Sequence, residues 1–202
     1  MRAAALALLA VALLPGCATT SEKLAIRDVP YNDHFSPTGL PPLAVQVQVE
    51  AARASEPIAD VRIAIRDAAG EYAVLPGTRW REPATELVRN LLVQAFEACH
   101  CVAAAQRAGS AARADYLLSS ELRELAVVQP KEGGPYAQVS ISYTIVRVRD
   151  GAAIATTELV REQMLARRSD PAGVDALAKA LNRMAGDSMG WAYAAIAADA
   201  TR

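Results

Sequence analysis

The feature that most restricts the fold is a pair of long strand-like runs on either side of a tight turn. Between Gln138 and Ile145, in "AQVSISYTIVR", apolar residues alternate one for one with Gln, Ser and Thr. A period of two predicts a half-buried strand whose apolar side faces a core. Asp150-Gly151 is a typical hairpin dipeptide and precedes the run "AAIATTELVREQMLA". The sequence therefore predicts an antiparallel hairpin with long arms.

Further strands and two amphipathic helices complete the pattern. Strand-like runs are found at 43–50, 61–67, 72–77 and 114–128, with a shorter piece at 101–104. Apolar residues at three- and four-residue steps predict helices over 82–99 and 169–200. We expect Asp170 to cap the second helix, whose pattern Gly186 and Gly190 interrupt. This order predicts an α+β fold: a single domain with a largely antiparallel sheet and two helices packed on one face.

The first sixteen residues have the layout of an export signal. "MRAAALALLAVALLPG", residues 1–16, has a charged start, an apolar run too short for the roughly 20 residues that span a bilayer, and a small-residue exit. Because Gly16 directly precedes Cys17, the exit resembles the bacterial lipobox. The resemblance implies cleavage before Cys17 and anchoring of Cys17 in the membrane by acyl chains such as palmitate. The alternative is an ordinary secretory signal with a chance cysteine.

The residue after Cys17 and the segment that follows it bear on where the mature protein is located. Ala18 stands where an aspartate typically retains a lipoprotein in the inner membrane, so the resemblance implies an outer-membrane protein that faces the periplasm. Residues 17–42 are rich in proline and show no sustained periodicity, which predicts a lipid anchor and a periplasmic tether, with a short edge strand around Tyr31. The folded domain is then expected over residues 43–202.

Composition and motifs argue against several functional classes. With 21 Lys and Arg against 22 Asp and Glu, the net charge is −1, whereas nucleic-acid-binding domains normally carry a basic face. The sequence contains no nucleophile elbow, phosphate-binding loop, dinucleotide fingerprint or zinc-protease motif. One of its two histidines, His34, lies in the predicted tether, and the other, His100, lies between two cysteines. We therefore predict no enzyme, no catalytic residue and no cofactor.

Cys99 and Cys101, in "EACHCVAA", allow three interpretations. An oxidising periplasm permits a disulfide, although a bridge between residues i and i+2 closes a very tight loop. The C-H-C arrangement lacks the C-x₂-C type of spacing found in metal sites, so no metal is predicted. The favoured interpretation is two small, mostly buried thiols, and a disulfide is the alternative.

The densest cluster of interface-type residues is Arg79, Trp80 and Arg81, in "PGTRWREP". Tryptophan and arginine are enriched in binding hot spots, so these residues are candidates for a partner-binding site. In the alternative, which the pattern favours, Trp80 fills the core under the first helix and the two arginines stay in solvent.

Several of these features together carry a family resemblance. They are the strand "LAVQVQV", the Arg79-Trp80 pair before a helix opened by Pro83, the strand that begins at Tyr116, the strand "AQVSISYTIVR" and the terminal stretch "VDALAKALNRMAGDSMGWA". In this order they resemble the ABC-type transport auxiliary lipoproteins, the group that includes the paraquat-inducible protein C type. One departure is "YNDHF", which has Asp33 where the family usually has a leucine.

The resemblance implies a non-catalytic adaptor in an envelope lipid transport system. Its partners would be an ABC transporter and proteins of the mammalian-cell-entry type, which move lipid between the inner and outer membranes. Sheet edges favour self-association into a homo-oligomer or contact by strand addition. The alternatives are a periplasmic lipoprotein that itself binds a lipid or small apolar ligand between sheet and helices, and an envelope assembly factor.

Overall fold

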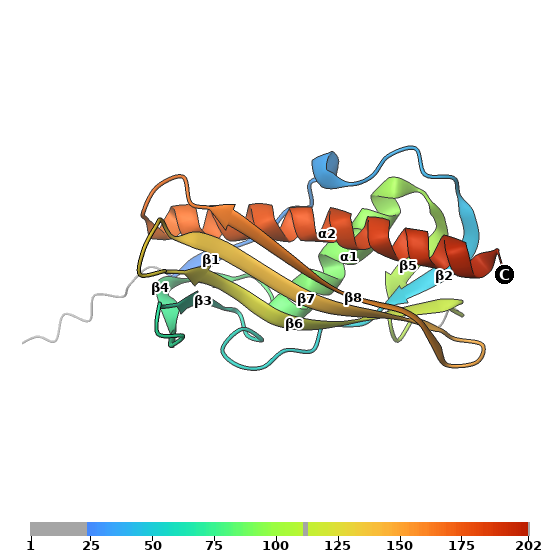
Figure 1. The fold of residues 1–202 in the computed structure, drawn as a ribbon, viewed down its shortest axis with the longest axis horizontal. Helices are drawn as coiled ribbons and strands as arrows, with labels where there is room; N and C mark the ends of the chain where they lie inside the picture. The colour runs from blue at the N-terminus through green and yellow to red at the C-terminus, as the bar shows by residue number, and fades with distance from the viewer. Residues whose placement is uncertain (1–23, 111–112, 202) are drawn as a thin grey trace, which may run out of the picture.

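The computed structural model describes residues 24–110 and 113–201. It shows a sheet with two helices on one face (Figure 1). The eight strands of the described part are β1 (Ala25–Arg27), β2 (Leu43–Val49), β3 (Arg62–Arg66), β4 (Tyr72–Trp80), β5 (Val102–Arg107), β6 (Tyr116–Val128), β7 (Tyr136–Arg147) and β8 (Ala152–Met164). The helices are α1 (Ala84–Cys99) and α2 (Asp170–Ala200), with a short 3-10 turn at Asp33–Phe35. The predicted α+β class and single domain are confirmed.

Strand β6 organises the sheet because it pairs along both of its edges. On one side it is antiparallel to β7, and β7 is antiparallel to β8. On the other side its first residues pair in parallel with β2 and its last residues in parallel with β3. Beyond these strands, β5 pairs with β2, and β4 pairs with β3 and β1. The sheet is therefore mixed, with most of its residue pairs antiparallel.

The predicted hairpin of β7 and β8 is present in full. Its register runs from Tyr136 opposite Met164 to Arg147 opposite Ala152, and Gly151 takes the positive φ of 71° in the turn. A left-handed conformation costs glycine little because it has no Cβ. The local turn dipeptide and the period-two alternation thus specify the same pairing.

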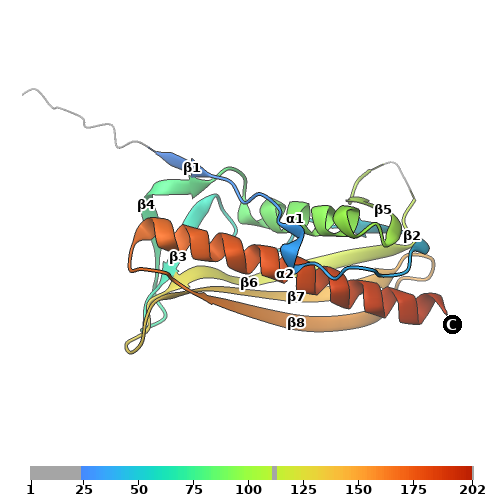
Figure 2. The same ribbon diagram turned by 90° about the horizontal axis from the view of Figure 1, so that it is seen from above.

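The core lies between the sheet and the two helices, which lie side by side across one face (Figure 2). The inward side chains of β7 are almost completely buried: Val139, Ile141, Tyr143 and Ile145 are each at most 1% exposed. Leucines of α1 and α2 pack against them, and the cavity that these side chains line measures only about 10 Å³. An interior filled to this extent has the close packing of an ordinary protein core.

Helix α2 is continuous over 31 residues, although two glycines interrupt its pattern. A Cβ added at Gly186 would lie 2.7 Å from the carbonyl carbon of Phe35, and one at Gly190 would lie 2.9 Å from the Pro37 ring. Both glycines are therefore places where the N-terminal segment approaches the helix closely. The helix begins at Asp170 with Ser169 as its N-cap residue, one position before the expected cap.

The segment expected to be a tether belongs to the folded domain over residues 25–42. Its strand is β1, not a strand around Tyr31, and β1 pairs in parallel with the end of β4. Farther along, the Asn182 side chain accepts a hydrogen bond from the Asn32 amide at 2.7 Å and donates one to the Pro30 carbonyl at 3.1 Å. The Tyr193 hydroxyl donates to the Pro41 carbonyl at 2.7 Å. The segment lacks a period of its own because α2 supplies these partners.

Candidate functional site

The predicted lipidation residue Cys17, with Ala18 and the leader 1–16, lies outside the described residues. The first described residue, Leu24, lies just before β1, at the end of the molecule that also holds β3 and β4 (Figure 1). The C-terminus of α2 lies at the opposite end of the long axis. The chain therefore enters the fold at one end of the long axis, and α2 finishes at the other end. Neither helix of the described part has an apolar stretch long enough to cross a membrane.

The structure separates the three residues of the candidate partner-binding cluster. Trp80 is 1% exposed and belongs to the core, whereas Arg79 and Arg81 are exposed. The Arg81 guanidinium forms an ion pair with Asp28 at 3.0 Å, and the Arg81 amide donates to the Arg27 carbonyl. Only the two arginines present surface to a partner, and one of them already fastens β1 to the end of β4.

Cys99 and Cys101 are joined by a disulfide, with their Cα atoms 5.1 Å apart. His100 between them has a φ of 50°, and this left-handed conformation ends α1 and turns the chain toward β5. Cys101 is completely buried. No group of three or more potential metal ligands occurs in the described residues. The Cys99–Cys101 disulfide fastens the junction between α1 and β5.

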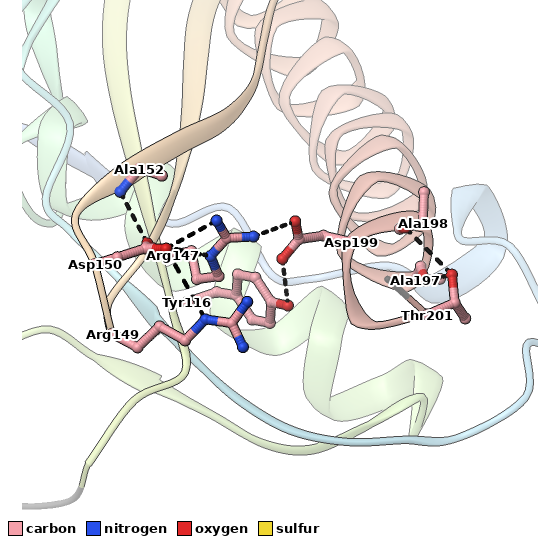
Figure 3. Close-up of polar contacts among 9 residues, drawn as sticks. All are labelled: Tyr116, Arg147, Arg149, Asp150, Ala152, Ala197, Ala198, Asp199 and Thr201. Carbon is pink, nitrogen blue, oxygen red and sulfur yellow. Dashed lines mark hydrogen bonds and ion pairs between the residues drawn. The ribbon is translucent and has the colours of Figure 1, made fainter.

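A network of charged side chains that the sequence analysis missed lies at the C-terminal end of α2 (Figure 3). The Arg147 guanidinium lies between two carboxylates and donates to Asp150 at 2.9 Å and to Asp199 at 2.6 Å. The Tyr116 hydroxyl donates to the other oxygen of Asp199 at 2.9 Å. The network thus links β6, the β7–β8 turn and the last turns of α2. Its members are far apart in the sequence, so no local motif marks it.

Hydrogen bonds within the network shift the pKa values of its charged members so that these side chains stay ionised. Hydrogen bonds to Asp150 and Asp199 raise the pKa of Arg147 above its usual range. Burial alone would raise the pKa of Asp199, but the hydrogen bonds from Tyr116 and Arg147 outweigh it, so the pKa is lowered. The hydrogen bond from Arg147 is the main cause of the lowered pKa of Asp150. Groups that stay ionised in this way fasten elements together and are poorly suited to proton transfer.

A sizeable cavity of the described part lies at the end of the sheet, not between the sheet and the helices. It measures about 640 Å³, within the range of small-molecule sites. Its apolar lining includes Ile65, Leu75, Val127 and Leu165, and its polar lining includes Lys131, Arg168 and Asp170. These residues come from β3, β4, β6, the β6–β7 loop, the β8–α2 connection and the start of α2. Because the segments are scattered along the chain, sequence reasoning did not find the cavity.

The fold and these sites describe a two-layer α+β domain whose ionic clusters fasten secondary-structure elements to one another. The chain belongs to the family of ABC-type transport auxiliary lipoprotein components, whose model matches residues 33–187. The predicted family is confirmed, and the family describes an auxiliary component of transport. The match begins ten residues before β2, in agreement with the packing of the N-terminal segment on α2.

Solved structures share the fold. A crystal structure of a protein from Xanthomonas campestris is 23% identical, covers 88% of this chain and 99% of its own, and superposes with a TM-score of 0.82. A second crystal structure, of an uncharacterized protein, is 12% identical, covers 83% of this chain and 97% of its own, and gives a TM-score of 0.63. At these identities the likeness concerns the fold alone. No curated protein matches the sequence significantly.

Proposed function

We propose that the protein is an outer-membrane lipoprotein facing the periplasm that acts as an adaptor in an ABC-type lipid transport system of the mammalian-cell-entry type. The observation that carries the proposal is the family match over residues 33–187. The lipobox-like cysteine, Cys17, supports the anchor, and Ala18 supports the choice of membrane. The domain itself would recognise protein partners and perform no chemistry.

The filled interior supports an adaptor over a carrier that binds lipid between its layers. The cavity lined by Leu91, Tyr143 and Leu181 between sheet and helices measures only about 10 Å³, far too little for an acyl chain. An acyl chain would have to displace core side chains such as Leu91 or Tyr143, which are at most 2% exposed. Recognition would therefore use the outer surface of the domain.

The open edge of β8 is the surface best suited to strand addition. Within the described chain β8 pairs with β7 alone, so one edge of a 13-residue strand has no neighbour. Val160 and Met164 on this strand are 43% and 58% exposed. An exposed edge strand is a template for pairing with another chain, either a transport partner or a second copy.

The test is crosslinked capture from cell envelopes. We expect the full chain to recover an ABC transporter subunit and a cell-entry-domain protein, and Val160→Lys to reduce that recovery because it places a charge on the edge. Val148→Lys is a matched control, since Val148 is 49% exposed in the β7–β8 turn. Recovery of neither component by the wild type would contradict the proposal. Recovery of envelope assembly proteins instead would favour an assembly factor.

The cavity at the end of the sheet favours a second candidate function, the binding of one lipid or small apolar ligand. Its volume of about 640 Å³ and its mixed lining suit an amphiphile. This candidate predicts that lipid copurifies with the protein in close to equimolar amount, whereas a pure adaptor predicts none. Native mass spectrometry of the purified protein distinguishes the two.

A further inference from the structure

Exposed apolar side chains are concentrated at the end of the domain where the chain enters the fold. Of the seven large hydrophobic side chains that are most exposed in the described part, five lie at this end: Leu24, Ile26, Tyr72, Val74 and Met164. Leu24 and Ile26 belong to the start of the described chain and to β1, and Ile26 is 56% exposed. Scattered apolar residues need no explanation, but a concentration at one end marks an interaction surface.

The other elements at this end are loops and strand ends. Figures 1 and 2 both place the β6–β7 connection and the β8–α2 connection at the same end as β1. Met164 ends β8 opposite Tyr136, and its methyl group would lie 3.2 Å from a Cβ on Gly134. The cavity lined by Leu165 and Pro135 belongs to the same end. Strand β1, the β3–β4 hairpin, these two connections and the end of β8 are called the entry end below.

The opposite end of the domain has a different character. It carries the Arg147 network and exposed charged side chains, including Asp115 and Arg149. Among the exposed large hydrophobics, only Val148 lies there. Both ends carry exposed charged side chains, among them Lys131, Arg167 and Arg168 at the entry end. What distinguishes the two ends is therefore the number of exposed large apolar side chains, which is greater at the end nearest the predicted anchor.

The length of chain before the fold limits how far the entry end can stand from the anchor. Seven peptide steps separate Cys17 from Leu24. Whatever conformation they take, they span at most about 25 Å, and a flexible chain of this length spans about 15 Å on average. A tether that ran to residue 43 would have reached more than three times as far. The packing of residues 25–42 on the domain thus brings the entry end close to the bilayer.

We propose that the entry end lies on the lipid surface of the membrane, with Leu24, Ile26 and Tyr72 at the boundary between headgroups and acyl chains. The proposal rests on the proposed lipid anchor at Cys17. Apolar side chains rimmed by polar groups bind this boundary in proportion to the area they bury, and tyrosine is suited to it because its ring is apolar and its hydroxyl polar. The opposite end, with the Arg147 network, then faces away from the membrane.

The test uses the full acylated protein reconstituted in vesicles of phosphatidylethanolamine and phosphatidylglycerol with brominated acyl chains, which quench tryptophan on contact. Three single variants are compared with the parent: Ile26→Trp and Tyr72→Trp at the entry end, and Val148→Trp at the opposite end. The exposed fractions of the three replaced side chains are similar, at 56%, 42% and 49%. The native tryptophans give the same background in every variant. Circular dichroism melts verify that each variant folds.

We expect the added tryptophan to be quenched and its emission blue-shifted at positions 26 and 72, and unchanged at position 148. Quenching at 148 alone, at all three positions or at none of them would overturn the proposed orientation. Flotation of the same vesicles tests separately whether the protein is anchored to the membrane. Protein that floats with the vesicles but shows the wrong quenching pattern refutes the orientation alone. Protein that fails to float refutes the anchor at Cys17 and the orientation with it.

Discussion

Replacing Gly186 by alanine tests whether the N-terminal segment is truly part of the domain. In an unobstructed helix the change would stabilise the protein by about 0.5–1 kcal/mol. Here the new Cβ would lie 2.7 Å from the carbonyl carbon of Phe35, which is backbone and cannot rotate away. The segment must therefore lift off α2. It would lose the two hydrogen bonds with Asn182, worth about 0.5–1.5 kcal/mol each, and the contact of Arg183 over the Phe35 ring, worth about 0.5–1 kcal/mol.

The balance predicts that Gly186→Ala lowers the free energy of unfolding by about 0.5–3.5 kcal/mol, which corresponds to a fall in Tm of about 1–14 °C for a domain of this size. Urea unfolding measures the loss, and hydrogen exchange should show reduced protection confined to residues 28–42. Gly173→Ala is the matched control, because its Cβ would meet the Val127 side chain and not the segment. A Gly186→Ala protein as stable as the parent, with 28–42 still protected, would refute the reasoning.

Three further predictions concern the polar network, the disulfide and the Trp80 cluster. Because the pKa of Asp199 is lowered on folding, its charge stabilises the fold above the unfolded pKa of about 3.9 and this stabilisation disappears as pH falls through the folded pKa. Asp199→Asn should therefore be less stable than the parent at neutral pH and approach it below about pH 4; urea midpoints that differ equally at all pH values would contradict this. Replacing Cys99 and Cys101 together by alanine should lower the free energy of unfolding in urea by no more than about 1.6 kcal/mol, since the closed loop has only three residues. A much larger loss would mean that the disulfide does more than close a loop. Trp80→Ala should lower stability by about 3–5 kcal/mol and Arg79→Ala by less than about 0.5 kcal/mol in thermal melts, whereas equal effects would place Trp80 at the surface.

The elements that the sequence predicted well are those specified by local patterns. The β7–β8 hairpin follows from alternation along both arms and from the turn at Asp150-Gly151, all within about 30 residues. Both helices follow from their apolar spacing. The parallel pairs of β6 with β2 and β3 could not be predicted in the same way, because their partners lie about 60–70 residues apart and no local feature sets the register.

The largest error concerned the N-terminal segment, and a signal for it existed in the sequence. Its proline-rich stretch has no periodicity because Asn182 and Tyr193 of α2 supply its hydrogen-bond partners. The signal was the pair Gly186 and Gly190, four residues apart on one face of an otherwise Ala- and Leu-rich helix, which marks a close approach of another backbone.

The candidate sites show the same limit. Residue type made Arg79, Trp80 and Arg81 candidates for one binding site, whereas the alternative that the pattern favoured, with Trp80 in the core and both arginines in solvent, is the arrangement in the structure. A strand directs neighbouring side chains to opposite faces, so the three do not form one surface. The Arg147 network and the end cavity bring together residues from four or more segments, and only the assembled fold reveals them.

The attachment of the N-terminal segment to α2 also leads to an expectation about the order in which the domain folds. The hydrogen bonds of Asn182 and Tyr193 join residues 150 and 152 positions apart. Contacts of such high sequence separation form late, because the chain entropy of closing so long a loop must be overcome first. Residues 28–42 are therefore synthesised early but can settle only after the chain is available as far as Tyr193. We therefore expect the part of the domain nearest the predicted anchor to be the last to fold.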